Sequence, residues 1–141
     1  MTVWFIDSSV ILRGLLGNSN AVRTWFADRG KNDDAWLGSR MLELEVRRVS
    51  RNSQIDTRDV DYYLDRFEFI AVTDNLIDDA IAMPHRLGSA DALHVATALK
   101  LHPLPLTFVT HDAQQARAIQ AMHAFDVHDP VTDDPKRPPV A

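Results

Sequence analysis

The chain has 141 residues, 45% of them apolar and 25% charged, a composition typical of one globular domain. It contains no cysteine, which excludes disulfides, thiolate metal sites and cysteine nucleophiles. The sequence has neither an apolar run of the roughly 20 residues that span a membrane nor the start of a signal peptide, so we expect a cytoplasmic protein without a membrane partner. The net charge of −5 weakly disfavours nucleic acid as a partner, although a cluster of carboxylates would account for most of that excess.

Short apolar runs alternate with amphipathic segments along the chain. The first half predicts a strand at 2–6, helices at 8–16 and 20–29, a strand at 35–37, a helix from a Ser39 cap to about residue 50, and a helix at 57–66. The second half predicts a strand at 67–72, a helix at 75–87 that Pro84 kinks or breaks, a helix from a Ser89 cap to about residue 101, a strand at 106–110, a helix at 112–124 and an edge strand at 125–128.

This alternation predicts an α/β fold with three layers, α/β/α, around a central parallel sheet of four to five strands. We expect one domain over residues 1–128. Prolines and charges from Asp129 onward predict a flexible C-terminal tail over 129–141.

Two aspartates follow predicted buried strands. Asp7 comes directly after the run Val3–Ile6, and Asp112 comes three residues after the run Leu106–Val109. In an open parallel sheet, ligands bind outside the carboxyl ends of the strands, so both carboxylates are candidates for a functional site. The ordinary alternative is that each of them only caps the helix that follows.

Two further acids belong to predicted helices. Glu45 lies amid apolar residues on the helix that begins near Ser39, and we prefer it to Glu43, which competes for the same role. The ordinary alternative for Glu45 is a solvated ion pair with Arg48, one turn later. Asp91 is in the first turn of a small, apolar helix, where free N–H groups stabilise a carboxylate regardless of function.

If that helix is buried, however, the Asp91 carboxylate needs a partner. His94, one turn later, is interpreted as a core residue rather than a neighbour of the site. Four carboxylates gathered at one edge would repel each other unless a hard cation neutralised them. The sequence therefore predicts a magnesium site.

Four segments, in order and over about residues 1–128, resemble the PIN-domain ribonucleases, and most closely the VapC-type toxins of type II toxin–antitoxin systems. They are Phe5-Ile6-Asp7-Ser8-Ser9, Ser39-x5-Glu45-x2-Arg48, the stretch Ala90–Ala98, and Phe108-Val109-Thr110-His111-Asp112. Some members of that family carry a further acid one turn after the last segment, where this chain has Ala116 and Arg117. The number of metal ions is therefore left open.

The resemblance implies a PIN-like fold and a Mg²⁺-dependent endoribonuclease, with Mn²⁺ as a substitute, that acts as the toxin of a toxin–antitoxin pair. It assigns four catalytic residues that bind the metal directly or through water, namely Asp7, Glu45, Asp91 and Asp112. Ser9 and Thr110 are expected to orient these carboxylates or a metal-bound water. The implied partners are an RNA substrate, most simply a single-stranded loop, a cognate antitoxin and a second copy of the chain.

Two other enzyme classes begin from an aspartate at a strand end. A haloacid-dehalogenase-like phosphatase needs a second acid two residues later, where this chain has Ser9. A receiver domain needs adjacent acids after the first strand and a lysine just beyond the last, and neither is present. The alternative that stays open is a catalytically silent PIN-like domain that serves as a binding or scaffold module.

Overall fold

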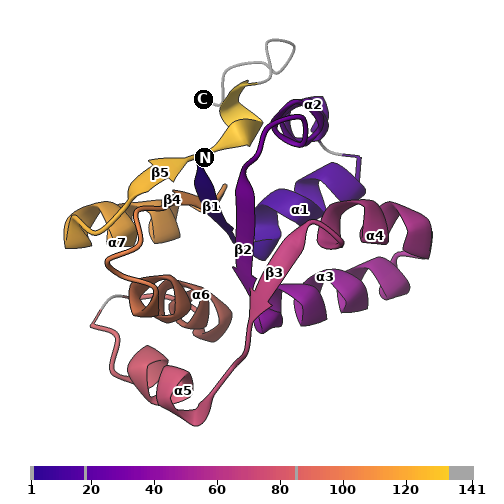
Figure 1. The fold of residues 1–141 in the computed structure, drawn as a ribbon. Helices are drawn as coiled ribbons and strands as arrows, with labels where there is room; N and C mark the ends of the chain where they lie inside the picture. The colour runs from indigo at the N-terminus through magenta and orange to yellow at the C-terminus, as the bar shows by residue number, and fades with distance from the viewer. Residues whose placement is uncertain (1, 18, 85, 134–141) are drawn as a thin grey trace.

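The computed structural model describes residues 2–17, 19–84 and 86–133. At its centre is a five-stranded sheet with the strand order β3-β2-β1-β4-β5, in which all neighbouring strands are parallel (Figure 1). The strands are β1 (Val3–Ile6), β2 (Ala35–Ser39), β3 (Phe67–Ile70), β4 (Thr107–Val109) and β5 (Asp126–His128). The predicted parallel sheet is therefore confirmed, with five strands.

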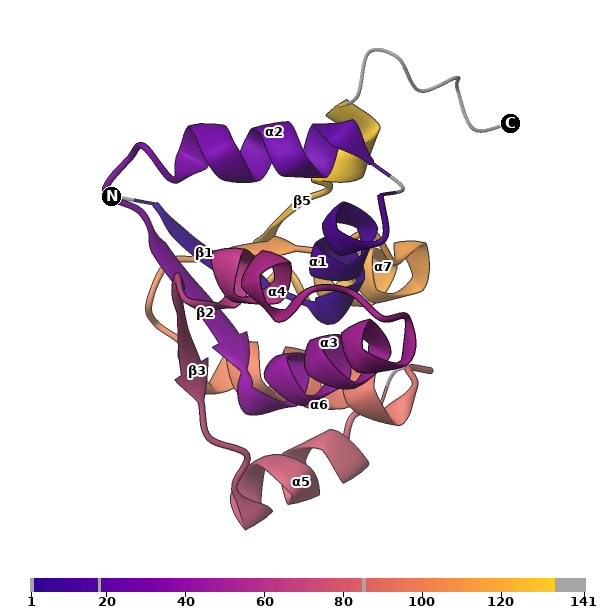
Figure 2. The ribbon, with the colours of Figure 1, turned by 90° about the vertical axis from the view of Figure 1, so that its right-hand side faces the viewer.

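Helices cover both faces of the sheet. They are α1 (Ser8–Leu15), α2 (Asn20–Arg29), α3 (Arg40–Asn52), α4 (Thr57–Leu64), α5 (Asp74–Ile81), α6 (Ser89–Lys100) and α7 (Ala113–Met122), followed by a 3-10 helix η1 (Pro130–Asp133). Helices α1 to α4 lie on one side and α5 to α7 on the other, which confirms the three-layer arrangement (Figures 1 and 2). Within the described residues, none of the helices combines the length and the apolar character that crossing a membrane requires.

The alternation of side chains along β1 divides the interior into two cores. Trp4 and Ile6 point into the core beneath α1 to α4, whereas Val3 and Phe5 point into the core beneath α6 and α7. Phe5 stacks on Phe108 of β4, with 5.3 Å between ring centroids. Because β1 is buried on both faces, its sequence is a continuous apolar run, as expected of a central parallel strand.

Two helix boundaries differ from the prediction. The helix expected over 75–87 is α5, which ends at Ile81. Proline disfavours helical backbone in the residue before it and lacks an N–H, so Pro84 stops this helix rather than kinking it. The N-cap of α6 is Gly88 and not Ser89, and Gly88 provides no side-chain cap. Asp91 is therefore the third residue of that helix.

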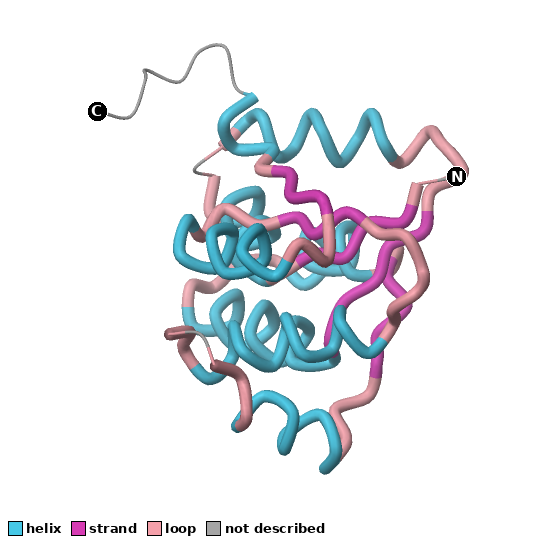
Figure 3. Tube along the Cα trace, turned by 90° about the vertical axis from the view of Figure 1, so that its left-hand side faces the viewer, coloured by secondary structure: helices cyan, strands magenta, loops and turns pink. Residues whose placement is uncertain are grey.

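The stretch after β5 also differs from the prediction of a flexible tail from Asp129. Residues 130–133 form η1, which packs beside α2 (Figure 3). Val131 is fully buried in the core beneath α1 to α4. Asp129 accepts a hydrogen bond from the Val131 N–H at 2.9 Å, and its other oxygen lies 2.9 Å from His111 Nδ1. Residues 129–133 thus belong to the domain, and the rest of the predicted tail lies outside the described residues.

Candidate active site

The carboxyl ends of β1 and β4 lie side by side at the point where the strand order reverses. From β1 the chain continues to β2 and β3 on one side, while β4 and β5 lie on the other. The Asp7 N–H donates to the Val109 carbonyl at 3.1 Å, which brings the ends of the two strands together. In open α/β sheets this switch point is where ligands bind.

Asp7 stands at the N-cap position of α1, yet its side chain makes no cap hydrogen bond. Instead, Ser9 Oγ donates to Oδ1 at 2.6 Å and Thr110 Oγ1 donates to Oδ2 at 2.7 Å. The residue is only 2% exposed. Burial raises the pKa of Asp7 to about 6, against the opposing effect of the two hydroxyl donors. The capping alternative is therefore wrong for Asp7, whose carboxylate is fixed by neutral groups.

The Thr110 hydroxyl belongs to a larger network. It lies 3.0 Å from Oε1 of the buried Gln115 and accepts the Asp112 N–H at 3.0 Å. Because the hydroxyl has one hydrogen, it donates to Asp7 or to Gln115 at any moment. Gln115 Nε2 in turn donates to the Asp91 carbonyl at 3.3 Å. Gln115 thus connects the loop after β4 to α6, a role that sequence reasoning missed.

The structure separates the two competing glutamates of α3. Glu45 Oε1 accepts from Ser8 Oγ at 3.1 Å and lies 2.9 Å from Nε2 of the buried His94. Glu43 instead forms ion pairs with Arg40 and Arg47, at 2.7 and 3.1 Å. Glu45 therefore faces the switch point, and Glu43 faces away from it.

The alternative of an ion pair between Glu45 and Arg48 does not hold, since none joins these two described residues. His94 is buried, as expected, but it is also a direct neighbour of the site. Its Nδ1 is buried without a hydrogen-bond partner among the described residues, so within them the contact with Glu45 is its one side-chain hydrogen bond.

Asp91 and Asp112 face each other across the site. Asp112 does cap α7, because its Oδ1 accepts from the N–H groups of Gln114 and Gln115 at 2.8 and 3.1 Å. Burial raises the pKa of Asp91, and the charges of Asp112 and Glu45 raise it further. Asp91 in turn raises the pKa of Asp7. Asp91 therefore repels each of the other three carboxylates and links the four into one electrostatic unit.

The four carboxylates supply oxygen donors and negative charge, a combination that suits a hard cation such as Mg²⁺. Among residues 2–17, 19–84 and 86–133, however, no three acidic or histidine side chains lie close enough to form a ready-made metal cage. Magnesium is often held by only one or two protein carboxylates and keeps several waters. The donors present could therefore hold such an ion partly through water.

A family model described as the PIN domain matches residues 4–120. The chain belongs to the PIN-domain family. Solved structures share this fold: VapBC2 from Rickettsia felis bound to a promoter DNA fragment has a TM-score of 0.67 at 12% identity, covering 91% of this chain and 98% of that one. DNA-bound VapBC from Salmonella typhimurium gives 0.66 at 14% identity, with coverages of 92% and 99%.

A toxin–antitoxin complex from Klebsiella pneumoniae gives a TM-score of 0.64 at 17% identity, covering 89% of this chain and 96% of that one. A comparison with curated proteins gives no match. At such low identities, the structural likeness establishes the fold of this PIN domain and not its substrate.

Around the acids of this PIN domain, sequence reasoning missed Gln115, and it interpreted His94 as a core residue although His94 contacts Glu45. One signal was available for His94, because it lies three residues after Asp91 and so shares a helix face with it. Gln115 had no such signal, since its contact with the Asp91 carbonyl joins residues that are 24 positions apart in the chain.

Proposed function

We propose that this PIN domain is a Mg²⁺-dependent endoribonuclease, with Mn²⁺ as a substitute, and the toxin of a toxin–antitoxin pair acting in the cytoplasm. The observation that carries the proposal is the electrostatic unit formed by Asp7, Glu45, Asp91 and Asp112 at the switch point of the sheet. The likeness of the fold to toxin–antitoxin complexes supports it.

The chain's own residues would prepare the site for hydrolysis of a phosphodiester bond. Bound magnesium would supply positive charge for the phosphate and an acidified water. Two hydroxyls hold Asp7, and the cap of α7 holds Asp112, so both carboxylates are fixed before substrate binds. Glu45, oriented by Ser8 and His94, would take the proton of the attacking water or act as a ligand.

The same proposal includes an antitoxin that binds beside the C-terminal end of α1. A cavity of about 410 Å³ lies between α1, α2 and α4, lined in part by Leu15, Arg23 and Tyr62. Tyr62 in this lining is 48% exposed, and Leu16, which follows Leu15 in the chain, is 41% exposed, which suits an apolar segment of a partner. The apolar residues of α2 do not line this cavity and instead fill the core: Val22, Trp25 and Phe26. A homodimer is also part of the proposal.

The test is cleavage of total cellular RNA by the purified chain in Mg²⁺. Asp7→Asn keeps the volume of the side chain and removes its charge, so it should abolish cleavage while the protein stays folded. Asp33→Asn is the matched control, because Asp33 is exposed in the loop before β2 and the charge change is the same. We expect discrete fragments from the wild type and the control, and none from Asp7→Asn or after addition of EDTA.

A wild-type protein that cleaves nothing in either Mg²⁺ or Mn²⁺, with bound antitoxin excluded by mass spectrometry, would contradict the proposal. The catalytically silent scaffold would then be the better account.

A further inference from the structure

His111 lies between two residues of the candidate active site. Thr110, whose hydroxyl lies 2.7 Å from Asp7 Oδ2, precedes it, and Asp112 follows it and caps α7. The His111 N–H donates to Ser9 Oγ at 3.2 Å, and Ser9 Oγ in turn donates to Asp7 Oδ1 at 2.6 Å. Each oxygen of Asp7 therefore contacts a hydroxyl group whose position depends on the backbone at His111.

The imidazole of His111 is held from two sides. On one side, its Nδ1 lies 2.9 Å from Oδ2 of Asp129, which follows β5. On the other side, its Nε2 lies 3.0 Å from Nη2 of Arg13 on α1. Arginine can only donate, so Nε2 accepts and the ring hydrogen lies on Nδ1, from which it is donated to Asp129. The two partners thus set both the orientation of the ring and its tautomer.

The two oxygens of Asp129 have different partners. Oδ1 accepts from the Val131 N–H at 2.9 Å, an ordinary cap of η1. Oδ2 faces His111 instead. Because Val131 is fully buried in the core beneath α1 to α4, the fold anchors Asp129 on the side away from His111. A carboxylate that is anchored in this way limits how far the imidazole can move.

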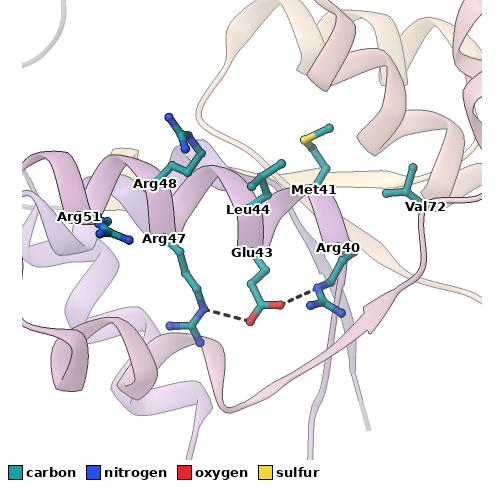
Figure 4. A pocket seen from close by; sticks show the side chains of 8 residues that line it. All are labelled: Arg40, Met41, Glu43, Leu44, Arg47, Arg48, Arg51 and Val72. Atoms are coloured by element: carbon teal, nitrogen blue, oxygen red, sulfur yellow. Dashed lines mark hydrogen bonds and ion pairs between the residues drawn. The ribbon is translucent and has the colours of Figure 1, made fainter.

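This arrangement differs from the charged contacts on the surface of α3. There, Glu43 pairs with Arg40 and Arg47 of the same helix, whose side chains are 68% and 40% exposed (Figure 4). Exposed pairs between neighbours on one helix contribute little to stability. The side chains of His111 and Asp129 are only 22% and 27% exposed, and their contact joins residues that are 18 positions apart. It therefore ties two segments of the fold together.

We infer that Asp129 is a positioning residue of the carboxylate site and acts through His111. The Asp129 carboxylate fixes the imidazole, and the fixed imidazole holds the backbone of residues 110–112. This backbone supports the two hydroxyl groups that contact Asp7 and carries the Asp112 side chain. The inference rests on the proposed function and extends it to the segment after β5.

The ordinary alternative is that Asp129 only caps η1. The two accounts differ in what they predict for the binding of a metal ion. Loss of a group that orients the ligands of a metal typically lowers metal affinity or activity 10- to 100-fold. Loss of a cap lowers the stability of the fold but leaves the site of the folded molecules unchanged.

The test variant is Asp129→Asn. Its amide oxygen can still accept from the Val131 N–H, but its amide N–H group faces the N–H of His111 Nδ1, so two donors meet and that hydrogen bond is lost. Asp126→Asn is the matched control, because it removes the same charge from an exposed residue of β5 three positions earlier. Both variants are compared with the wild type at equal folded fractions.

The first measurement is the affinity for Mn²⁺ in the absence of RNA, from the electron paramagnetic resonance signal of the free ion. The affinity should fall about tenfold in Asp129→Asn and change little in Asp126→Asn. The second measurement is cleavage of a short single-stranded RNA at saturating Mn²⁺. There, kcat should fall about tenfold in Asp129→Asn with little change in KM, because the reacting groups are disturbed and the binding of RNA is not.

Variants of His111 test the route from Asp129 to the site. His111→Ala removes the ring and should lower the Mn²⁺ affinity about tenfold, as Asp129→Asn does. His111→Asn places an amide N–H near the position of Nδ1, so it restores the donor to Asp129 and should recover most of that loss. The double variant Asp129→Asn/His111→Ala should bind Mn²⁺ as tightly as His111→Ala alone, because residues that act as one unit do not have additive effects.

Equal Mn²⁺ affinities of Asp129→Asn and Asp126→Asn, in a wild type that binds Mn²⁺ and cleaves RNA, would overturn the inference and leave the proposed function standing. Additive losses in the double variant would also overturn it, since Asp129 would then act by a route other than His111. A wild type that neither binds Mn²⁺ nor cleaves RNA would remove the proposed function and this inference together.

Discussion

The Asp7 carboxylate is nearly inaccessible, and both of its oxygens accept hydrogen bonds from hydroxyl groups. Neutral donors do not replace the water that a charged carboxylate loses on burial, and its pKa rises from 3.8 to about 6. At about 1.4 kcal/mol per pKa unit, ionised Asp7 lowers the free energy of unfolding by about 3 kcal/mol at neutral pH. Ionised Asp7 thus destabilises the fold, so its presence is explained by a role in function rather than by stability.

Asp7→Asn should therefore be at least as stable as the wild type at pH 7.5 in EDTA. Asp7 binds its proton more tightly in the folded chain, so its stabilising effect is present below about pH 4 and is lost as the pH rises to about 6. The advantage of the variant, up to about 3 kcal/mol, should disappear at low pH. Urea denaturation at pH 7.5 and pH 4 measures the difference in the free energy of unfolding between variant and wild type. A variant that is less stable than the wild type at pH 7.5 would contradict the prediction.

The contact between His94 and Glu45 leads to a second prediction. His94→Leu keeps an apolar side chain in the buried position but removes the donor that orients Glu45, so cleavage should fall about 10- to 100-fold. His94→Gln places an amide N–H near the position of Nε2 and should recover most of that loss. Cleavage rates of both variants, at equal folded fractions, check the prediction. If the two variants lose the same activity, the hydrogen bond is not the cause.

At the scale of elements, the sequence predicted most strands and helices because their boundaries depend on neighbours in the chain. Ser39 caps α3 by accepting from the Met41 N–H, as expected from its place before an amphipathic segment. The start of α6 was one residue off, since glycine and serine are both favoured as N-cap residues and Gly88 precedes Ser89. The length of α5 was overestimated because the helical pattern was extended past Pro84 to Gly88, whereas the break at Pro84, one of the two open alternatives, is what the structure has.

Helix packing gives a third prediction, at Gly14 of α1. A Cβ atom there would lie 2.7 Å from Tyr63 Oη and 3.2 Å from a Val22 methyl group. Tyr63 is buried against α1 and cannot move away freely, so Gly14→Ala should lower the free energy of unfolding by about 1 to 3 kcal/mol. Thermal or urea denaturation measures the change.

Gly30→Ala is the matched control. A Cβ at Gly30 would meet the end of the Arg66 side chain, a flexible group that can turn aside. We expect a smaller loss than at Gly14. If the two substitutions cost the same, the contact with Tyr63 is not the reason that Gly14 is needed.

At the scale of the whole molecule, the site could be predicted only in outline. Acids after β1 and β4 had to meet, because parallel strands place their carboxyl ends at one edge. Which oxygen contacts which hydroxyl could not be predicted, since the partners of Asp7 and Glu45 come from segments up to 103 residues away in the sequence. Such contacts depend on the packing of both layers.

The same limit explains why the sequence predicted a flexible tail where η1 lies. The composition of this segment resembles that of a linker, although Val131 is buried in the fold. Val131 has no exposed surface and closes the core beneath α1 to α4 beside α2. Val131→Ala removes two methyl groups from this core and should lower the free energy of unfolding by about 2 kcal/mol. Val72→Ala, the same change at a residue that is 38% exposed, should cost less than about 0.5 kcal/mol. Urea denaturation of the two variants measures these changes. A larger loss for Val131→Ala would mean that the C-terminal segment is part of the core. Equal losses in the two variants would mean that η1 does not stabilise the domain.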